Sequence, residues 1–564
     1  MSEMITVGEA IARTLEQYQV TTVYGVISIH NLPIADAIGR RAKIDFTPSR
    51  GEAGAVTMAD AHSRFSGLGV ALTSTGAGAG NAVGSMIEAM NACSPMLHIT
   101  GQVEKAYLDM DAGFIHETAD QLGFLRSSSK QAFRVHTPEQ AVATLHKAIQ
   151  VAQTAPCGSV SIEIPIDIQS AQVPLSLLSA PLSVPTLPAI CSSQIEAIWD
   201  KLQHAQRPLL WVGGGALQAV EAVKRLANQG VAVISSTHGR GILSDDHPFS
   251  LRAFHNADSI DTLMRECDLT LVAGSRLRSN ETKTWSLPLP HPIIQIDINP
   301  LAANRNYLAD LNITGDCKGL LNALADKIEQ ANRPVSSAWK QQIQQAVQLA
   351  EQQLRAQCRP YSELSDAVEQ ALPEHGIFVR DITVSGSLWG SRLLKATQPM
   401  HNIHSLAGAI GLGLAMAIGS AKANPNTAVI GLVGDGGLML GVGELATMAQ
   451  EQLPIVLIIM NDQGYGVMRG IQEKYFSGRQ YYNELLTPSF SQLAQSMGIT
   501  ALTVDKPSEF QPILHQAVAL KRPVVVEVLM NHIGKMNFST PAEKTILTSN
   551  FLSSAALRRA LQIH

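Results

Sequence analysis

The sequence contains little cysteine, charge or aromatic residue. Only 6 of its 564 residues are cysteine, and none of them lies in a C-x-x-C pair. This spacing argues against a zinc knot or a disulfide framework and fits a reducing compartment, so we expect a cytoplasmic location. Charged residues make up 16% of the chain, the net charge is −5, and no long run carries one sign. Neither nucleic acid nor an anionic membrane surface is therefore expected as a partner.

Long apolar runs are also missing. No stretch reaches the roughly 18 uninterrupted apolar residues that a transmembrane helix needs, so we expect no membrane span. The first residues, "MSEMITVGEAIARTLEQYQV", have the pattern of an amphipathic helix with acidic residues. They lack the apolar core of a signal peptide. With 45% hydrophobic residues the composition is that of an ordinary globular protein.

Short β-branched runs alternate with helical segments along most of the chain. Examples are "GVALTST", "PLLWVGGG", "AVIGLVGD" and "PIVLIIMND". Apolar strands separated by helices predict parallel sheets covered by helices on both faces. The expected fold class is therefore α/β, with doubly wound, mainly parallel-sheet domains.

The alternation stops at two places, which we interpret as domain boundaries. Residues 169–193 contain four prolines among small residues and read as a linker. Residues 336–357 are a glutamine-rich stretch that predicts an inter-domain helix. The length suggests roughly three or four domains. We predict three domains and a C-terminal tail of unassigned role, with the boundaries 1–170, 190–335, 355–545 and 546–564.

The stretch "IGLVGDGGLML", residues 430–440, places one carboxylate among glycines at the end of a predicted buried strand. Ligands of open α/β sheets bind at such strand ends. Glycines there allow backbone N–H groups to approach an anion such as a phosphate. A carboxylate beside a phosphate needs a cation between them, and Mg²⁺ binds oxygen ligands of both kinds. Asp435 is thus a candidate magnesium ligand.

A second oxygen ligand is expected at the end of the next strand. The strand "PIVLIIM", residues 454–460, is followed by "NDQGYG", and Asn461 lies 26 residues after Asp435. That spacing accommodates one helix and one returning strand. The alternative is that each motif is only a tight turn, and this alternative is weaker for the two motifs together than for either alone.

This pair of motifs resembles the signature of thiamine diphosphate enzymes. The resemblance implies that Asp435, Asn461 and the carbonyl of Gln463 hold Mg²⁺, which in turn holds the diphosphate. It implies further cofactor contacts from a set of four residues: Gly434, Gly436, Gly437 and Tyr465. The resemblance spans nearly the whole chain and makes the three domains pyrimidine-binding, middle (FAD-fold-like) and diphosphate-binding.

A thiamine enzyme also needs a carboxylic acid that protonates the aminopyrimidine ring. Glu52 follows Gly51 and begins the predicted helix "AGAVTMADAHSR". The stretch is similar to the glutamate-containing helix of the family, which makes Glu52 the candidate acid. The alternative is an ordinary glutamate favoured by the helix dipole.

The glycine-rich stretch "TSTGAGAGN", residues 73–81, lacks the Lys-Ser/Thr of a P-loop and the G-x-G-x-x-G spacing. It resembles the pyrimidine-lining loop of the family, with Gly76 and Asn81 as cofactor contacts. Ala77 stands where the family commonly has proline, which leaves the detailed contact of the loop open.

Two histidines are candidate proton-transfer groups, because imidazole titrates near neutral pH. His30, in "YGVISIHNLP", resembles the histidine beside the reacting carbon in benzaldehyde lyase and several 2-oxo-acid decarboxylases. His116, in "FIHETADQLG", stands where acetolactate synthases commonly have glutamine. Each is alternatively a turn histidine bonded to backbone. His62 is interpreted as structural.

Three more cofactor contacts come from the resemblance. Ile410, in "LAGAIGLGLAMAIG", would be the stiff side chain that wedges the cofactor into a folded shape. The alternative is glycine-assisted helix packing. Ser385 and Ser387, in "RDITVSGSLWG", are hydroxyl candidates for the diphosphate.

The middle segments "PLLWVGGGA", "VAGSRLRSNETKTW" and "QIDINP" are similar to the domain that binds FAD in acetolactate synthases and pyruvate oxidases. Many relatives keep this domain without a flavin, and the glycine run is equally a tight turn. FAD is therefore a minor expectation beside thiamine diphosphate and Mg²⁺.

The resemblance implies a C–C bond lyase or carboligase that acts on a 2-oxo acid or a 2-hydroxy ketone through a C2 ylide and an enamine. It also implies at least a homodimer, and a dimer of dimers is expected. Open alternatives are an acetolactate synthase, a flavin-dependent 2-oxo-acid oxidase, and a nucleotide- or CoA-binding protein without catalysis. The substrate pocket is expected near residues 467–483, whose basic residues Arg469, Lys474 and Arg479 are read as facing water.

Overall fold

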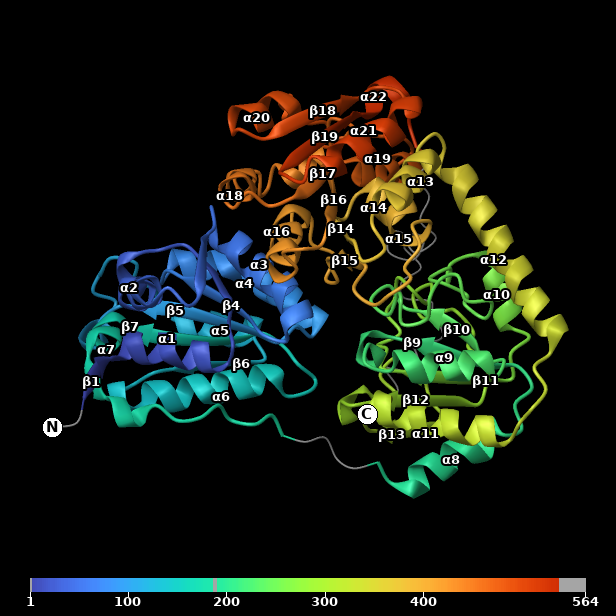
Figure 1. Cartoon of the computed structure of the whole chain (residues 1–564), viewed down its shortest axis with the longest axis horizontal. Coiled ribbons are helices and arrows are strands. Elements are labelled where there is room, and N and C mark those ends of the chain that lie inside the picture. The colour runs from blue at the N-terminus through green and yellow to red at the C-terminus, as the bar shows by residue number, and fades with distance from the viewer. Residues whose placement is uncertain (1–2, 186–189, 537–564) are drawn as a thin grey trace.

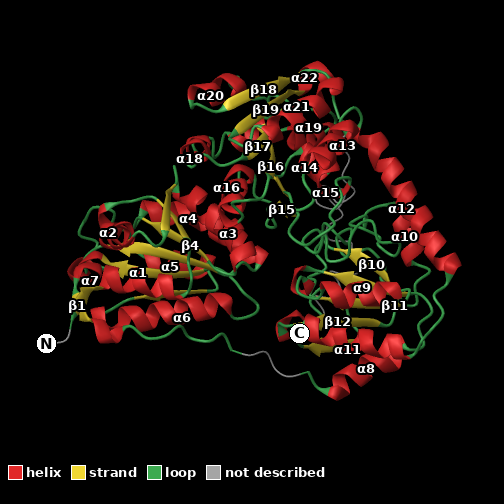
Figure 2. Ribbon diagram, viewed as in Figure 1, coloured by secondary structure: helices red, strands yellow, loops and turns green. Residues whose placement is uncertain are grey.

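The computed structural model describes residues 3–185 and 190–536. These residues form three α/β domains, in which helices pack against a central sheet (Figures 1 and 2). Each has its own parallel sheet, which confirms the predicted fold class. No helix in these ranges is long and apolar enough to cross a bilayer. The predicted tail, residues 546–564, and the last predicted residues of the third domain lie outside the described residues.

The N-terminal sheet has six parallel strands in the order β3-β2-β4-β5-β7-β6. Most of these strand residues are buried, because helices cover both faces. A two-stranded antiparallel pair, β1 (Met4–Thr6) and β8 (Gln172–Pro174), joins the two ends of the domain. The strands are β2 (Thr22–Gly25), β3 (Asp45–Pro48), β4 (Gly69–Thr73), β5 (Met96–Gln102), β6 (Gln131–Arg134) and β7 (Val160–Pro165), and the helices are α1 (Val7–Gln17), α2 (Leu32–Arg41), α3 (Glu52–Ser66), α4 (Ala77–Ala92), α5 (Gln121–Ser128), α6 (Ala141–Gln153) and α7 (Ile166–Ser170).

The C-terminal sheet repeats this topology, with the order β15-β14-β16-β17-β19-β18. In each of these two sheets the first strand along the chain lies between the second and the third, so the chain winds in opposite directions from it. Folds of this kind bind ligands at the carboxyl ends of the first and third strands. The strands are β14 (Ile377–Arg380), β15 (Asn402–His404), β16 (Val429–Gly434), β17 (Ile455–Asn461), β18 (Thr500–Val504) and β19 (Val524–Leu529), and the helices are α13 (Ser362–Ala371), α14 (Val384–Ser387), α15 (Trp389–Arg392), α16 (Gly413–Ala423), α17 (Asp435–Leu438), α18 (Glu444–Gln450), α19 (Gly466–Tyr475), α20 (Phe490–Ser496), α21 (Phe510–Ala519) and α22 (Met530–Ile533).

The middle domain has a five-stranded parallel sheet in the order β10-β9-β11-β12-β13. Its strands are β9 (Pro208–Val212), β10 (Ala232–Ser235), β11 (Leu269–Ala273), β12 (Ile293–Asp297) and β13 (Leu311–Thr314), and its helices are α8 (Ser192–Leu202), α9 (Val220–Asn228), α10 (Asp258–Met264) and α11 (Cys317–Gln330).

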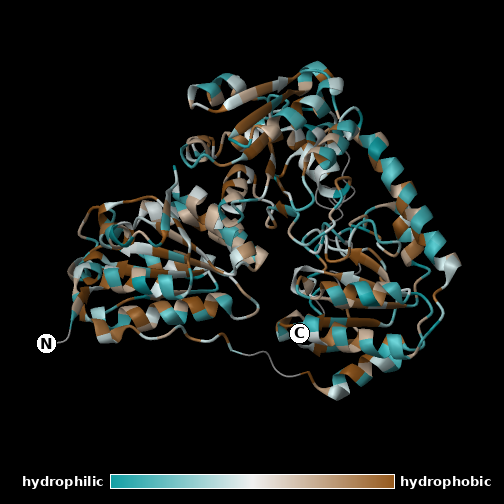
Figure 3. Cartoon of the chain, viewed as in Figure 1, coloured by the Kyte–Doolittle hydropathy of each residue, from teal (hydrophilic) through white to brown (hydrophobic). Residues whose placement is uncertain are grey.

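The glutamine-rich stretch forms the single long helix α12 (Ser337–Cys358). It runs along the outside of the molecule from the middle domain to the C-terminal domain (Figure 1). Most of its length is hydrophilic (Figure 3), whereas Trp339, Ile343, Ala350 and Leu354 are buried. These positions recur at helical spacing, so one face of the helix packs against protein and the glutamines face outward.

The N-terminal and C-terminal domains pack together through α3 and α16. Buried Val56 and Met58 of α3 share one hydrophobic cluster with Ala417 and Ile418 of α16. Gly419 makes this approach possible, because a Cβ there would lie 2.2 Å from the carbonyl oxygen of Met58. The contact fixes the beginning of α3, where Glu52 lies, relative to the C-terminal sheet.

Candidate active site

A cavity of about 180 Å³ opens at the carboxyl ends of β14, β16 and β17. It lies at the point where the strand order of the C-terminal sheet reverses. The lining residues come from the ends of β16 and β17, from the segments that follow β14, β15, β16 and β17, and from the beginnings of α19 and α22: Ile382, Thr383, Val384, Ser385, Gly408, Ile410, Gly434, Asp435, Gly436, Gly437, Met460, Asp462, Gly464, Tyr465, Gly466, Val467, Met468 and Met530.

Asp435 is fully buried at the bottom of this cavity. Its Oδ2 accepts a hydrogen bond from the Gly464 N–H at 2.9 Å, whereas its Oδ1 has no partner among the described residues. Asp462 lies beside it and also lines the cavity. Burial, together with the nearby Asp435 carboxylate, raises the pKa of Asp462 to about 7. Two adjacent carboxylates with one unpartnered oxygen form a donor set that fits a divalent cation.

After β17, the side chain that lines the cavity together with Asp435 is that of Asp462, and Asn461 is not among the lining residues. Asn461 Nδ2 donates to Glu527 at 2.9 Å, and its Oδ1 accepts the Gln463 N–H at 3.2 Å. The Gln463 carbonyl accepts the Leu485 N–H at 3.0 Å. Neither Asn461 nor Gln463 is among the residues that line the cavity, although Gln463 directly precedes Gly464, whose N–H donates to Asp435. Gly464 lines the cavity in place of Gln463.

Arg469 of α19 compensates part of the negative charge of this pair. Its Nη1 lies 3.3 Å from Asp462 Oδ2. The prediction that Arg469 simply faces water does not match this contact. The positive charge of Arg469 balances the carboxylate of Asp462. A neutral amide such as that of Asn461 would not need this compensation.

The glycines expected beside the diphosphate do line the cavity. A Cβ at Gly436 would lie 2.9 Å from the ring of Tyr465, and one at Gly437 would lie 3.2 Å from Asp381 Oδ2. Ser385, at the start of α14, lines the cavity with a buried hydroxyl that has no partner among the described residues. Ser387 is not among the lining residues.

Ile410 projects into the cavity from a loop held by a carboxylate that sequence reasoning missed. Asp381 follows β14 directly, and its Oδ2 accepts the Gly411 N–H at 2.8 Å. Burial raises the pKa of Asp381 to about 6 despite these backbone hydrogen bonds. The same reasoning that identified Asp435, an acid at the end of an apolar strand, would have identified Asp381.

In the N-terminal domain, Glu52 is the first residue of α3. Its Oε2 accepts a hydrogen bond from Asn81 Nδ2 at 3.2 Å. A Cβ at Gly78 would lie 2.8 Å from Glu52 Oε1. The helix has no side-chain cap of its own at its N-terminus. Glu52, Asn81 and the glycine-rich loop after β4 therefore lie together, as the sequence suggested.

His30 and His116 are also brought together, with ring centroids 5.3 Å apart. His30 is only 2% exposed and its Nδ1 has no partner among the described residues, whereas His116 is exposed. His116 Nδ1 lies 3.4 Å from the Ser74 hydroxyl, and its carbonyl lies against Gly76. Burial, and to a smaller extent His116, lowers the pKa of His30. The two imidazoles thus lie together at the strand ends, beside the loop that contacts Glu52.

His62 has a structural contact, as expected. Its Nδ1 lies 2.8 Å from the buried hydroxyl of Tyr24, and burial lowers the pKa of His62 to about 4.

Glu52, His30 and His116 are not among the described residues that line the Asp435 cavity. Every described residue that lines the Asp435 cavity belongs to the C-terminal domain. Both groups are surrounded by exposed apolar side chains, including Ile29 and Ile115 beside the histidines and Leu440 and Met468 beside the cavity.

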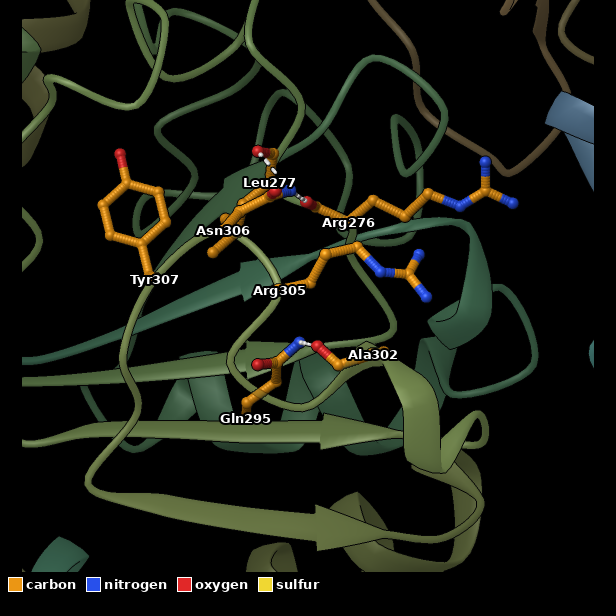
Figure 4. Close-up of a pocket in the computed structure, with 7 residues that line it drawn as sticks. All are labelled: Arg276, Leu277, Gln295, Ala302, Arg305, Asn306 and Tyr307. Atoms are coloured by element: carbon orange, nitrogen blue, oxygen red, sulfur yellow. Dashed lines mark hydrogen bonds between the residues drawn. The ribbon is translucent and has the colours of Figure 1, made fainter. Parts of the chain in front are cut away.

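The middle domain has a small pocket at the ends of β11 and β12 (Figure 4). The guanidinium groups of Arg276 and Arg305 extend in the same direction from it. The glycine turn after β9 is closely packed, because a Cβ at Gly214 would lie 2.3 Å from the ring of His238 and one at Gly215 would lie 2.8 Å from Gly274. The turn after β9 is therefore in close contact with His238 and with the turn after β11.

Three family models match the chain in order. They are "Thiamine pyrophosphate enzyme, N-terminal TPP binding domain" over residues 5–124, "central domain" over 195–324, and "C-terminal TPP binding domain" over 384–528. Similar curated proteins include a probable acetolactate synthase large subunit of Methanocaldococcus jannaschii, 27% identical over 93% of this chain and 91% of that protein. The acetolactate synthase isozyme 2 large subunit of Escherichia coli is 28% identical, over 93% and 95%. A probable 2-ketoarginine decarboxylase of Pseudomonas aeruginosa is 29% identical, over 82% and 83%.

Proposed function

Because the chain belongs to the thiamine diphosphate-dependent enzymes, we propose that it breaks the C–C bond beside the carbonyl of a 2-oxo acid or 2-hydroxy ketone with the help of Mg²⁺. The observation that carries the proposal is the pair formed by His30 and His116 at the strand ends, beside the glycine-rich loop that also contacts Glu52. When bound, thiamine diphosphate supplies a thiazolium that stores the electron pair of the broken bond. The steps assigned to the protein concern binding and proton transfer.

The cation and diphosphate would be held at the end of β16. Asp435 and Asp462 provide carboxylate oxygens for Mg²⁺. Gly436 and Gly437 leave room for backbone N–H groups to approach a diphosphate, and the unpartnered Ser385 hydroxyl is a further donor. The chemistry of these donors fits the cofactor, although sequence reasoning chose Asn461 and Gln463 instead of Asp462 and Gly464.

Glu52 would hold a proton for the far nitrogen of the aminopyrimidine. Its position at the head of α3, with Asn81 as hydrogen-bond donor, keeps its carboxyl group beside the glycine-rich loop that would line the ring. Ile410 would press the two rings of the cofactor together from the opposite domain.

His30 and His116 would protonate the carbon or oxygen left after bond cleavage. His30 is buried and its pKa is lowered, so it delivers a proton only after receiving one, and the exposed His116 is the group that exchanges with water. Protonation of the carbon, followed by loss of the proton from the neighbouring hydroxyl, would let an aldehyde leave, as a lyase or decarboxylase requires. Transfer of the acyl group to an acceptor gives a carboligase.

A complete site would require two copies of the chain. In one chain the cavity is lined only by described residues of the C-terminal domain, whereas Glu52 and the histidines lie on the N-terminal domain. Exposed Ile29, Ile115, Leu440 and Met468 provide apolar surface for such an association. We propose a homodimer as the minimum, with a dimer of dimers as the expected assembly in the cytoplasm.

An acetolactate synthase is the second candidate. The names of the relatives from Methanocaldococcus jannaschii and Escherichia coli favour it. It would transfer an acyl group to a second 2-oxo acid and has no need to protonate the acyl carbon. His116 in place of the expected glutamine favours the lyase.

The experiment is to incubate the purified protein, with thiamine diphosphate and Mg²⁺, with a panel of 2-oxo acids and acyloins. The panel includes pyruvate and a guanidino 2-oxo acid. CO₂, aldehyde and acetolactate-type products are followed together. Aldehyde formation supports the lyase, and acetolactate with no aldehyde supports the second candidate. Absence of any cofactor-dependent turnover across the panel would reject both. An absorbance peak near 450 nm in the purified protein would establish that FAD is bound.

A further inference from the structure

One wall of the Asp435 cavity is a loop without regular structure. Residues 405–412 connect β15 to α16, and Gly408 and Ile410 of this loop line the cavity. Gly408 and Gly411 have positive φ values of 90° and 86°. A segment with two such glycines has considerable backbone freedom, so its position in the folded protein depends on contacts from outside.

One end of this loop is held from within the C-terminal domain. The Asp381 carboxylate accepts the N–H groups of Gly411 and Gly413, at 2.8 and 3.4 Å. This contact lies directly after Ile410.

The other end is held by Glu88, which belongs to α4 of the N-terminal domain. Glu88 is 1% exposed and accepts hydrogen bonds from the Ser405 hydroxyl at 2.8 Å, from the Ala407 N–H at 2.9 Å and from the Leu406 N–H. The segment that contains Gly408 and Ile410 is therefore held at its two ends by two buried carboxylates, those of Glu88 and Asp381.

Two arginines complete this attachment and bring in the middle domain. Arg64 of α3 pairs with Asp60 at 2.7 Å, lies 3.9 Å from Glu88 and donates to the His404 carbonyl at 2.9 Å. Arg278 of the middle domain donates to the Leu406 carbonyl at 2.5 Å. The N-terminal and middle domains thus both contact residues 404–407, which directly precede Gly408.

We propose that Glu88 is a positioning residue, which sets the place of Ile410 in the cofactor cavity through the backbone of Leu406 and Ala407. The inference rests on the proposed function, because it assigns Ile410 a contact with the cofactor rings. A carboxylate can accept three hydrogen bonds at once. The amide of glutamine has the same shape but presents an NH₂ group to at least one backbone N–H, so it cannot hold the loop in the same way.

The test compares Glu88→Gln with wild type, using two probes in the presence of Mg²⁺. On the proposed function, thiamine diphosphate would contact the whole cavity, whereas inorganic pyrophosphate would occupy only the end near Asp435. We expect Glu88→Gln to bind thiamine diphosphate about tenfold more weakly and pyrophosphate within twofold of wild type. Glu139→Gln is the matched control, since Glu139 is exposed and lies outside this network. Unchanged binding of both probes, or an equal loss for both, overturns the proposal.

A double-mutant cycle with Ile410→Ala tests the route of the effect. If Glu88 acts through Ile410, Glu88→Gln costs little further affinity for thiamine diphosphate in the Ile410→Ala background. Full additivity contradicts the proposal. Should Glu88→Gln fail to fold, Ser405→Ala removes one of the three hydrogen bonds and should show the same selective loss, at about threefold.

The same measurements separate this inference from the proposed function. Wild-type protein that fails to bind thiamine diphosphate refutes the proposed function itself. Wild-type binding with an unaffected Glu88→Gln variant refutes only the role of Glu88.

Discussion

Gly76→Ala should reduce turnover strongly, because the backbone conformation of Gly76 and the nearby carbonyl of His116 both leave no room for a side chain. Its φ of 58° and ψ of −114° lie in a region open essentially to glycine, and an L residue there costs about 1–3 kcal/mol. A Cβ at this position would lie 2.2 Å from the carbonyl oxygen of His116. Contacts below 3.0 Å essentially never occur at a real Cβ, so the two segments must separate by about 0.8 Å or more.

This displacement moves His116 away from its place beside His30. Misplacement of a reacting group by about 1 Å costs on the order of 10²-fold in rate. We therefore expect kcat/KM for the preferred 2-oxo acid to fall about 10²-fold.

Gly80→Ala is the matched control for this prediction. Gly80 lies in the same glycine-rich stretch, but a Cβ there meets nothing within 4 Å. Gly80→Ala should therefore keep nearly full activity. Both variants are assayed for turnover, for thermal stability and for affinity for thiamine diphosphate. If Gly76→Ala turns over as fast as Gly80→Ala, the assignment of His116 to the reaction is refuted.

The other predictions concern the acid, the cation, the buried histidine and the pH dependence of stability. Glu52→Gln should lower turnover by about 10²–10⁴-fold while thiamine diphosphate still binds, and turnover at the wild-type rate would contradict the proposed mechanism. Asp462→Asn should weaken Mg²⁺ binding in a titration of chelator-treated protein, whereas unchanged affinity would remove Asp462 from the cation site. Since His30 is proposed to donate a proton and burial lowers its pKa, turnover should begin to fall with rising pH already below its ordinary pKa of about 6.5, and His30→Gln should flatten that limb of the pH profile. Burial lowers the pKa values of His62 and His98 to about 4, so between pH 6.5 and 4 these histidines bind protons in the unfolded state but not in the folded state. The free energy of unfolding should therefore decrease as the pH falls through this window, by up to about 1.4 kcal/mol per pH unit for each histidine. A melting temperature that does not change between about pH 7.5 and 5.5 would disprove this.

Much of the fold was predictable because its signals are local. Apolar strands of four to seven residues alternating with helical segments gave the α/β class, and the glutamine-rich stretch gave α12 (Ser337–Cys358). Asp435 and Glu52 could also be identified from the sequence, since each follows a glycine at a strand end or a helix start. The positions of these residues depend on short-range geometry that the sequence specifies.

The identity of the second oxygen beside Asp435 was decided only by tertiary structure. Sequence spacing alone does not tell on which residue β17 ends, and successive side chains of a strand point to opposite faces. β17 extends to Asn461, whose amide is engaged by Glu527 of the neighbouring strand, so the following residue, Asp462, faces the cavity. The candidate ligand beside Asp435 is therefore a carboxylate one residue further along the chain than the predicted amide, and Arg469 lies 3.3 Å from it.

The sequence by itself determined which kind of fold this chain adopts, which family it resembles and which acid lies among glycines, because strands, turns and helix starts depend on neighbouring residues. Tertiary structure alone decided that His30 and His116 meet, that Asp381 and Glu88 hold the loop of Ile410, and that the candidate groups of one chain lie on separate surfaces. Residues such as Glu88 and Leu406 are separated by more than 300 positions. Their contact arises only when α3 and α16 pack the first domain against the third, and no local pattern in the sequence encodes it.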